Sequence, residues 1–269
     1  MPEGHTIHQL ARDHRRLLAG RRLAASSPQG RFAAGAALLD GRCLDTVDAY
    51  GKHLFYDWSG GVLLHVHLGL FGRFLLHEGD APPPPVGAVR LRLIAGGDER
   101  PPATLDLRGP TECGVLDAGE REVIVARLGP DPLRTDADPQ RFIDRAGRTR
   151  RAIGAVVLDQ SVIAGLGNVY RSEVLFACGI DPRRAGRDVS ETELRCIWDT
   201  ARSMLRKGVR DRRIVTVDRR DLPRPTGRRP QRGEATYVYH RPVCLRCGSS
   251  IESFELGNRM SFSCPTCQR

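Results

Sequence analysis

The sequence predicts an α+β protein whose N-terminal part is a β-sandwich or barrel and whose C-terminal part is helical. Short runs of β-forming residues, broken by frequent glycines, extend from Arg21 to about Leu116, and this spacing is typical of sandwiches and barrels. From Glu120 onward, apolar residues recur with the period of an α-helix. Near the C-terminus, two pairs of cysteines enclose a hairpin-like segment. The chain therefore divides into a strand-rich part, a helical part and a small cysteine-bearing module.

The strand-rich part is preceded by an expected helix. Apolar residues recur at helical spacing from His5, and Gly20 is a suitable end for the helix. Such a helix would hold the N-terminus against the body of the first domain. Four consecutive prolines between Asp80 and Val86 indicate an exposed loop. The clearest strand candidates are Lys52–Trp58, Val62–Leu68, Phe71–Leu76, Val89–Ile94 and Ala103–Leu107.

A linker is expected at Leu128–Leu133, where one glycine and two prolines interrupt the pattern. Between Arg206 and Glu234, arginine and proline are frequent, and this composition cannot build a core. The stretch is either a solvated loop or a segment that becomes ordered on an anionic partner. The expected helices cover about Pro139–Ala146, Ala152–Leu158, Val169–Ala177 and Ser190–Lys207. The resulting domains are residues 1–128, a hinge at 129–134, a helical domain at 135–235 and a finger at 236–269.

The composition indicates the kind of partner. The net charge of the 269-residue chain is +10, and a protein this basic usually binds something anionic, most commonly nucleic acid. No long apolar run is present, so neither a signal peptide nor a membrane span is expected, and the chain is expected to be cytoplasmic. Disulfides are not expected in that compartment. The four cysteines outside the C-terminal pairs are therefore expected to be small core residues: Cys43, Cys113, Cys178 and Cys196.

The two C-terminal cysteine pairs have the spacing of a four-cysteine zinc site. Each pair is a Cys-x-x-Cys, and sixteen residues separate the pairs. Two redox pairs or coincidence is the alternative. Between the pairs, Ser250–Leu256 and Met260–Ser263 alternate like two strands joined by Gly257 and Asn258, which places Arg259 near the tip, where it either binds phosphate or is solvated. The four expected ligands of one structural zinc ion are Cys244, Cys247, Cys264 and Cys267.

A second local signal lies between Asp159 and Glu173, where a helix ends, a glycine-bearing turn follows and a new helix begins near Asn168. Gly165 and Gly167 allow the backbone to approach a ligand closely. A helix N-terminus with bare N–H groups suits a phosphate. For Asn168, helix capping is the alternative, and it is compatible with a phosphate contact.

The N-terminus itself offers a candidate nucleophile. Removal of Met1 would leave Pro2 with a free secondary amine, of which a useful fraction is unprotonated near neutral pH, whereas a lysine side chain is far more protonated. Such an amine can attack an aldehyde-like carbon and form an iminium ion, while the neighbouring carboxyl of Glu3 can transfer protons. Many chains that begin with Met-Pro have no such function, so this reading depends on the remaining motifs.

Together these motifs resemble the formamidopyrimidine-DNA glycosylase and endonuclease VIII family of DNA repair glycosylases. The resemblance covers the whole chain and rests on four motifs in the right order: Pro2-Glu3-Gly4, a lysine in a strand at position 52, the Asp159–Glu173 segment, and a zinc hairpin ending at Cys264–Gln268. It implies an N-terminal catalytic β-sandwich with flanking helices, a C-terminal helical domain with a helix–two-turns–helix, and a zinc-bound β-hairpin.

The resemblance also implies a mechanism. Pro2 would attack C1′ of a damaged nucleotide and expel the base, Glu3 would transfer protons at the sugar, and β,δ-elimination would cut the strand on both sides of the lesion. Lys52 matches the family lysine that contacts the phosphate next to the lesion. The partner would be double-stranded DNA with an oxidised base or an abasic site, bound by a monomer in the bacterial nucleoid. The expected DNA-binding residues are Asn168, Arg259 and, as apolar wedges that fill the void left by the extruded base, Leu70 and Phe71, for which strand core is the alternative.

The sequence departs from the family at His5 and Thr6, where Pro-Glu is usual, so that a second acidic residue near the sugar is missing. The start Met-Pro-Glu-Gly-His-Thr looks more like the endonuclease VIII branch in its actinobacterial form, which implies oxidised pyrimidines as substrates. Three alternatives remain: a purine-specific glycosylase of the same family, a non-catalytic zinc-containing protein that binds damaged DNA, and an unrelated zinc-ribbon nucleic-acid binder.

Overall fold

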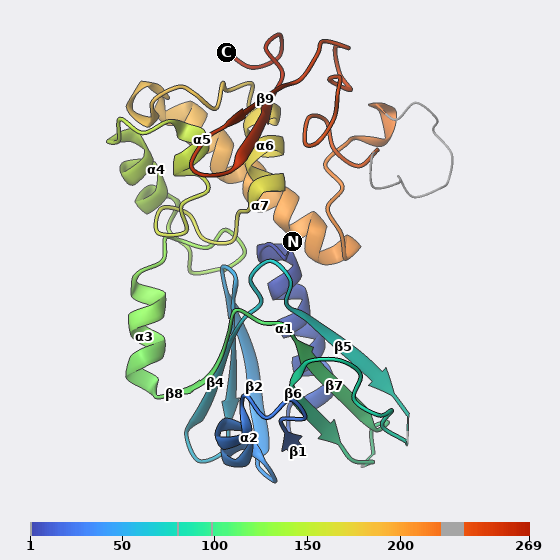
Figure 1. Ribbon diagram of the computed structural model, residues 1–269. Helices are drawn as coiled ribbons and strands as arrows, with labels where there is room; N and C mark the ends of the chain where they lie inside the picture. Colours follow the sequence, from blue (N-terminus) through green and yellow to red (C-terminus); the bar gives the residue numbers. More distant parts are fainter. Residues whose placement is uncertain (1, 80, 98, 222–233) are drawn as a thin grey trace. The chain divides into compact units, whose positions relative to one another are not determined.

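The computed structural model describes residues 2–79, 81–97, 99–221 and 234–269, which form two compact units (Figure 1). The sandwich unit consists of Pro2 and the described residues from Ile7 to Ala126. The helical unit consists of residues 3–6 and the described residues from Arg127 to the C-terminus. The first helix, α1 (Gly4–Leu18), begins among residues of the helical unit and continues into the sandwich unit. The expectation that this helix lies wholly on the first domain is therefore met from Ile7 onward but not for residues 3–6.

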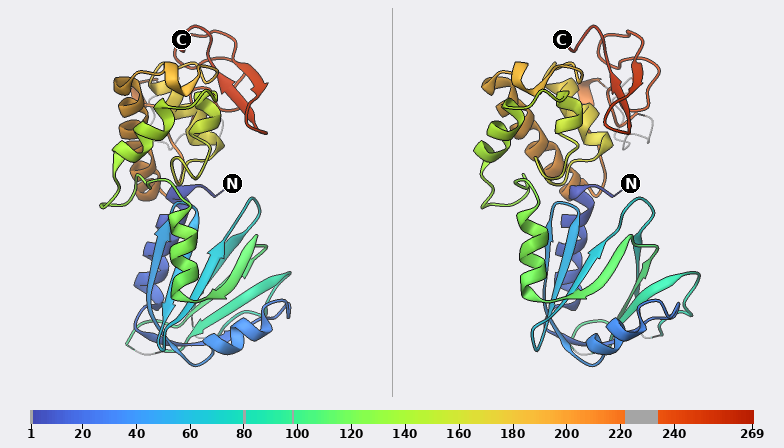
Figure 2. Two further views of the ribbon diagram at one scale, coloured as in Figure 1. Left: turned by 90° about the vertical axis from the view of Figure 1, so that its left-hand side faces the viewer. Right: turned by 60° about the vertical axis from the view of Figure 1, so that its left-hand side comes forward.

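Within its described residues, the sandwich unit contains eight antiparallel strands. Strand β1 joins two layers, because Arg21 and Arg22 pair with β2 whereas the residues from Leu23 to Ser26 pair with β6. One layer has the order β1-β2-β3-β4-β8 and the other has the order β1-β6-β7-β5 (Figures 1 and 2). The strands are β1 (Arg21–Ser26), β2 (Cys43–Tyr50), β3 (His53–Trp58), β4 (Val62–His67), β5 (Arg73–Glu78), β6 (Val89–Ala95), β7 (Ala103–Arg108) and β8 (Glu112–Leu116).

The core of this unit lies between the two layers and α1. Alternate residues of a strand share one face, and Leu54 and Tyr56 of β3 are fully buried together with Leu93 and Leu105 of the other layer. Leu18 of α1 belongs to the same cluster. Full burial of one such leucine stabilises the fold by about 1.5–3 kcal/mol relative to exposure. The amphipathic pattern from His5 therefore correctly predicted α1.

Three features of the sandwich unit differ from the sequence predictions. A short helix, α2 (Ala33–Leu39), interrupts the strand-rich part and buries Ala36 and Leu39. Strand β5 begins two residues later than expected, because the chain turns at Gly69, whose φ is +66°, and Gly72 donates to the carbonyl of Leu68. A further helix, α3 (Ala118–Ala126), follows β8 and contacts the outer face of the sheet, where Arg121 binds Asp48 and stacks on Phe55.

Buried His14 predicts acid sensitivity of the sandwich unit. Its imidazole shares a 2.8 Å hydrogen bond with the hydroxyl of Tyr56, and burial lowers the pKa of His14 from 6.5 to about 4. Between these values the unfolded chain binds a proton that the folded chain does not, so the free energy of unfolding should fall by about 3 kcal/mol as the pH drops. Urea unfolding at pH 7 and pH 5 should show a smaller decrease for His14→Gln than for the wild type. Equal decreases would contradict this role.

The helical unit packs its helices around a second core. The largest helix, α7, begins after Ser190, whose hydroxyl and Glu193 form a capping box. This helix continues to Asp211, so the first part of the predicted arginine-rich loop is helical. Of the remainder of that stretch, residues 212–221 are described and include a short 3₁₀ helix, whereas residues 222–233 lie outside the described residues. The elements are α4 (Pro139–Gly147), α5 (Ile153–Val156), α6 (Asn168–Ala177), η1 (Gly186–Asp188), α7 (Glu191–Asp211), η2 (Arg219–Asp221), β9 (Glu252–Glu255) and β10 (Met260–Ser263).

The predicted linker is packed into the helical unit. Residues 128–132 are buried, Gly129 donates to the carbonyl of Gln160, and Ala164 donates to the carbonyl of Pro130. A side chain at Gly129 would collide with the backbone of Val162. The absence of a side chain at Gly129 therefore allows the linker to pack closely against the backbone at Val162. No helix in the described part of the chain is both long enough and apolar enough to span a membrane.

A disulfide in the helical unit corrects one prediction. Cys178, at the end of α6, is bonded to Cys196 on α7. The expectation that both are ordinary core thiols is wrong, because their Cα atoms lie 6.0 Å apart and Cys196 is exposed. Cys43 and Cys113 keep free thiols and are only partly buried. The bond joins two cysteines that are eighteen residues apart in the sequence, a pairing that cysteine spacing alone does not reveal.

Candidate active site

The carboxylate of Glu3 binds the N-terminus of α6. Its Oε2 accepts a hydrogen bond of 2.7 Å from the amide of Gly167 and a longer one of 3.4 Å from Tyr170. Its Oε1 accepts a bond of 2.9 Å from the amide of Val169. Glu3 is completely buried, and a negative charge is favoured at a helix N-terminus. The side chain therefore caps α6 from a position more than 160 residues away in the sequence.

Glycines make this approach possible. The amide of Gly4 donates to the carbonyl of Gly165 at 2.7 Å, and a Cβ atom on Gly4 would lie 2.9 Å from the Cα of Gly165. A Cβ atom on Gly167 would collide with the Glu3 carboxylate. Gly165 and Gly167 thus allow a close approach, as predicted, but the approaching group is the N-terminal segment of the chain itself.

His5, further along that segment, is also buried. The imidazole of His5 packs edge-on against the ring of Tyr170, with 5.3 Å between the ring centroids. A Cβ atom on Gly208 of α7 would lie 3.0 Å from the Cβ of His5. Burial lowers the pKa of His5 to about 4, so this side chain is neutral at pH 7. His5 thus makes a neutral aromatic contact that holds residues 3–6 on the helical unit.

Asn168 is the first residue of α6 and does not cap it. Gly167 occupies the cap position, and the Asn168 amide donates instead to the carbonyl of Met260 at 3.0 Å. The capping alternative is therefore wrong. The expectation of bare N–H groups at this helix N-terminus is also wrong for Gly167, Val169 and Tyr170, because Glu3 accepts their hydrogen bonds.

Arg171 connects α6 to the tip of the C-terminal hairpin. Its guanidinium is completely buried and donates to the carbonyl of Leu256 at 2.9 Å and to the carbonyl of Met260 at 2.7 Å. Between these acceptors, Gly257 and Asn258 have φ values of +62° and +58°, as a two-residue hairpin turn requires. Arg259 follows the turn and is exposed, so its side chain is available to a partner. Asn168 and Arg171 together fix the backbone that carries Arg259.

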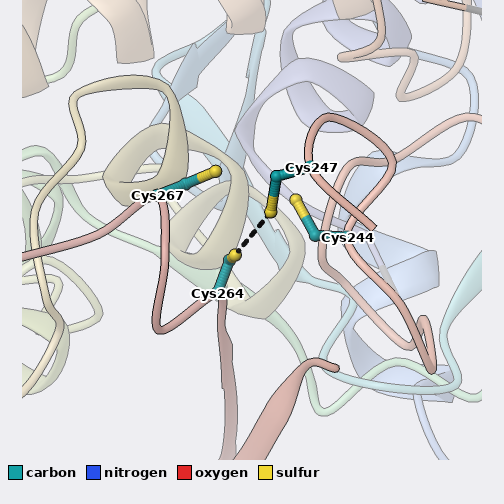
Figure 3. A group of neighbouring side chains, drawn as sticks. All are labelled: Cys244, Cys247, Cys264 and Cys267. Carbon is teal, nitrogen blue, oxygen red and sulfur yellow. Dashed lines mark hydrogen bonds between the residues drawn. The ribbon is translucent and has the colours of Figure 1, made fainter. Parts of the chain in front are cut away.

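The four C-terminal cysteines form one cluster (Figure 3). Their sulfur atoms all lie within 4.8 Å of one another, and Cys247 Sγ is 3.4 Å from Cys264 Sγ. A tetrahedral zinc ion with bonds of about 2.3 Å places its sulfur ligands about 3.8 Å apart, so these residues fit the metal. Four protein thiolates leave no open position for a reactant, which makes the site structural.

A buried acid that no sequence pattern marks as functional holds the segment leading to the finger. Glu173 of α6 accepts hydrogen bonds from the amides of Tyr237 at 2.8 Å, Val238 at 2.9 Å and Tyr239 at 3.0 Å. The Thr216 hydroxyl donates to the same carboxylate. Burial raises the pKa of Glu173, whereas these hydrogen bonds oppose the rise. An acid within a helical motif gives no sequence signal for such distant amide partners.

The remaining predicted residues lie in the sandwich unit. Lys52 is in the two-residue turn between β2 and β3, not in a strand, because Tyr50 pairs directly with His53. Leu70 and Phe71 lie in the turn between β4 and β5, with 41% and 83% of their surface exposed. The strand-core alternative for these two residues is therefore wrong. Phe71 is the most exposed large apolar side chain among the described residues.

Family models match three successive parts of the chain. The formamidopyrimidine-DNA glycosylase N-terminal domain matches residues 1–113, the H2TH domain of the same glycosylase matches residues 128–219, and the zinc finger found in FPG and IleRS matches residues 242–269. Endonuclease 8 1 of Mycobacterium tuberculosis (strain ATCC 25618 / H37Rv) is 47% identical over 278 residues, which cover 100% of both chains. The chain belongs to the formamidopyrimidine-DNA glycosylase and endonuclease VIII family.

Other members of this family show how far the similarity extends. The formamidopyrimidine-DNA glycosylase of Geobacter metallireducens is 29% identical over 289 residues, covering 100% of both chains. The crystal structure of the MutM (Fpg) protein from Thermus thermophilus has a TM-score of 0.77 at 29% identity and covers 99% of this chain and 98% of that chain. The predicted α+β fold, with a sandwich, a helix–two-turns–helix and a zinc finger, is thus confirmed. The members of the family are DNA glycosylases with AP lyase activity. This chain is therefore a DNA glycosylase with AP lyase activity.

Proposed function

We propose that this glycosylase removes oxidised bases, chiefly pyrimidines, from double-stranded DNA and then cuts the strand by β,δ-elimination, using Pro2 as the nucleophile. The observation that carries the proposal is the placement of Glu3. Its buried carboxylate is held by three backbone amides, so the residue next to Pro2 has a fixed position in the helical unit. Groups held in one geometry before the reaction lower its barrier.

In the proposed reaction, the nitrogen of Pro2 forms a bond to C1′ of the damaged nucleotide as the bond from C1′ to the base breaks. The base leaves with the electron pair and takes up a proton. Opening of the sugar ring then gives an iminium ion, which acidifies the C2′ proton. Loss of this proton expels the 3′ phosphate, and a second elimination expels the 5′ phosphate. Water finally releases Pro2 from the sugar fragment.

We assign proton transfer at the sugar to Glu3. Its carboxyl directly follows the nucleophile in the sequence, and the amides at the start of α6 hold it in one position. Side-chain proton transfer of this kind typically accelerates a reaction by about 10²–10⁴-fold. Thr6 stands where the family usually has an acid, and the neutral imidazole of the neighbouring His5 adds no charge at this point.

We assign DNA contacts to residues of both units. Lys52, in its turn, would bind the phosphate beside the lesion. In the helical unit, Asn168 and Arg259 would bind phosphate. The shared attachment of Asn168 and Arg171 to the Met260 carbonyl supports this, because it fixes the hairpin tip relative to α6. The exposed side chains of Leu70 and Phe71 suit insertion between base pairs.

Similarity supports pyrimidine lesions, because the 47% identical mycobacterial relative bears the name Endonuclease 8 1. Removal of 8-oxoguanine or formamidopyrimidine is the alternative, since relatives near 29% identity are named for the latter. One structural zinc ion in the four-cysteine cluster completes the proposal.

Borohydride trapping on a duplex with one abasic site tests the nucleophile. Reduction of the iminium should leave a covalent adduct on the N-terminal peptide of the wild type. Pro2→Gly keeps an N-terminal amine but makes it primary, so the trapped adduct should form and strand cleavage should slow by about 10–100-fold. Intact mass in parallel should show that Met1 is absent from both proteins.

Two results would contradict this assignment. An adduct that maps to a peptide other than the N-terminal one would remove Pro2 as nucleophile. A processed protein that forms no adduct but still binds the duplex would favour a non-catalytic binder of damaged DNA. Comparison of thymine glycol with 8-oxoguanine duplexes then distinguishes the two glycosylase alternatives.

A further inference from the structure

Three adjacent strands of the sandwich unit place four metal-ligand side chains on one face of the sheet. His65 and His67 are alternate residues of β4 and therefore point to the same side. His53 of β3 lies directly opposite His67, and Glu112 of β8 lies opposite His67 on the other side. Buried core residues occupy the opposite face of the same strands, including Leu54 and Val66, so this cluster lies outside the sandwich core.

The side chains in this cluster are close enough to share an ion. Nδ1 of His53 is 2.9 Å from Nε2 of His65, and Nδ1 of His65 is 3.7 Å from Oε2 of Glu112. One donor atom from each of these three residues can be chosen so that all three lie within 4.8 Å of one another. The ring of His67 is 4.9 Å from that of His53, close enough to approach the same point.

We infer that His53, His65 and Glu112 form a binding site for a divalent transition-metal ion such as Zn²⁺, separate from the four-cysteine cluster. Imidazole nitrogens with a carboxylate oxygen are a donor set that suits zinc, nickel and copper. Zinc bonds of about 2.0–2.2 Å place tetrahedral ligand atoms about 3.3 Å apart. The two imidazole nitrogens need to separate by only a few tenths of an ångström to reach that distance.

The cluster is open to solvent on the side of Glu112 and closed on the side of His65, so an ion can enter past the Glu112 carboxylate. The side chain of Glu112 is 58% exposed, whereas that of His65 is 4% exposed. Glu112 can rotate from its present position to bring an oxygen onto the ion. His65 is instead held in place by stacking on Phe55, with ring centroids 5.2 Å apart. A rigid imidazole beneath a movable carboxylate can therefore capture an ion from solution, with His67 or water completing its coordination.

The alternative is a hydrogen-bonded histidine pair with no ion, and zinc stoichiometry distinguishes the two. The full-length protein is equilibrated with excess Zn²⁺, passed through gel filtration and analysed for zinc. We expect two zinc ions per wild-type chain, one of them in the cysteine cluster. Co²⁺ added to protein that carries a single zinc ion, in the cysteine cluster, should give a visible absorption band without the thiolate charge-transfer band of a cysteine site.

Matched variants locate the second ion. His53→Gln should hold one zinc ion per chain, and Glu112→Gln, a change at an exposed side chain, should weaken the second site by about 10–100-fold. His77→Ala removes a partly buried histidine from β5 of the same unit and should retain both ions. Circular dichroism confirms that each variant is folded. A wild type that holds one ion at saturation, or a second ion that persists unchanged in both His53→Gln and Glu112→Gln, would overturn the inference.

Discussion

Replacement of Glu3 by glutamine is expected to lower the single-turnover rate of base excision by about 1,000-fold. Glutamine keeps the size of the side chain but cannot take up a proton from the sugar, and general acid–base catalysis contributes about 10²–10⁴-fold. The amide nitrogen of the glutamine would also face the N–H of Gly167 or Val169, which now donate to the carboxylate. Pre-steady-state excision from a duplex with a single oxidised pyrimidine measures the effect.

A loss of stability accompanies this change and has to be separated from catalysis. A buried amide left without an acceptor costs about 1–3 kcal/mol. Glu173→Gln is the matched control. Glu173, on α6, resembles Glu3 in being fully buried and in accepting hydrogen bonds from three backbone amides. Both variants should lose a similar free energy of unfolding, but only Glu3→Gln should lose most of its rate per folded molecule. Equal rate losses would reduce Glu3 to a structural cap.

Replacement of Cys264 by alanine is expected to abolish zinc binding by the finger and unfold it. Cys264 is fully buried and belongs to the same hydrophobic cluster as Phe176, Tyr237 and Val238. Structural zinc sites contribute about 10–16 kcal/mol of apparent binding free energy to folding, so loss of one of the four ligands should remove most of what stabilises the finger. Unfolding of the hairpin would release Arg259 from its fixed backbone. DNA affinity should therefore fall together with zinc content.

Zinc analysis, circular dichroism and duplex binding at a fixed salt concentration check this prediction. The salt concentration matters because phosphate contacts weaken steeply as it rises. Cys43→Ala removes a partly buried thiol of the sandwich unit and should leave zinc content and affinity unchanged. A Cys264→Ala protein that binds DNA normally while its cysteine cluster holds no metal would contradict the structural role of the metal.

Several features of this protein were predictable because they depend on short stretches of chain. Apolar residues at helical spacing predicted α1, α4, α6 and α7, since a repeat of 3.6 residues places them on one face of a helix. Cys-x-x-Cys pairs predicted the cysteine cluster, because each pair brings two sulfur atoms together in one turn. Gly257 and Asn258 predicted the hairpin turn, because few other residues adopt positive φ readily.

Other features arise only when distant segments meet. Nothing local to Glu3 shows that its carboxylate binds the amides at the start of α6, or that Gly167 is required to admit it. The disulfide between Cys178 and Cys196 depends on how α6 and α7 pack. The same holds for His53, His65 and Glu112, which come from three strands and become neighbours through their register.

The sequence by itself thus determined the types of the main elements, the cysteine cluster and, through the order of its motifs, the family. The tertiary structure decided what each functional group contacts. The physical reason is range: periodicity and turn chemistry act over a few residues, whereas the partners of a buried charge are set by the packing of segments far apart in the chain. Glu3 is an example of each. Its position next to Pro2 in the sequence made it a candidate catalytic residue, but only the tertiary structure shows that its carboxylate binds the amides at the start of α6.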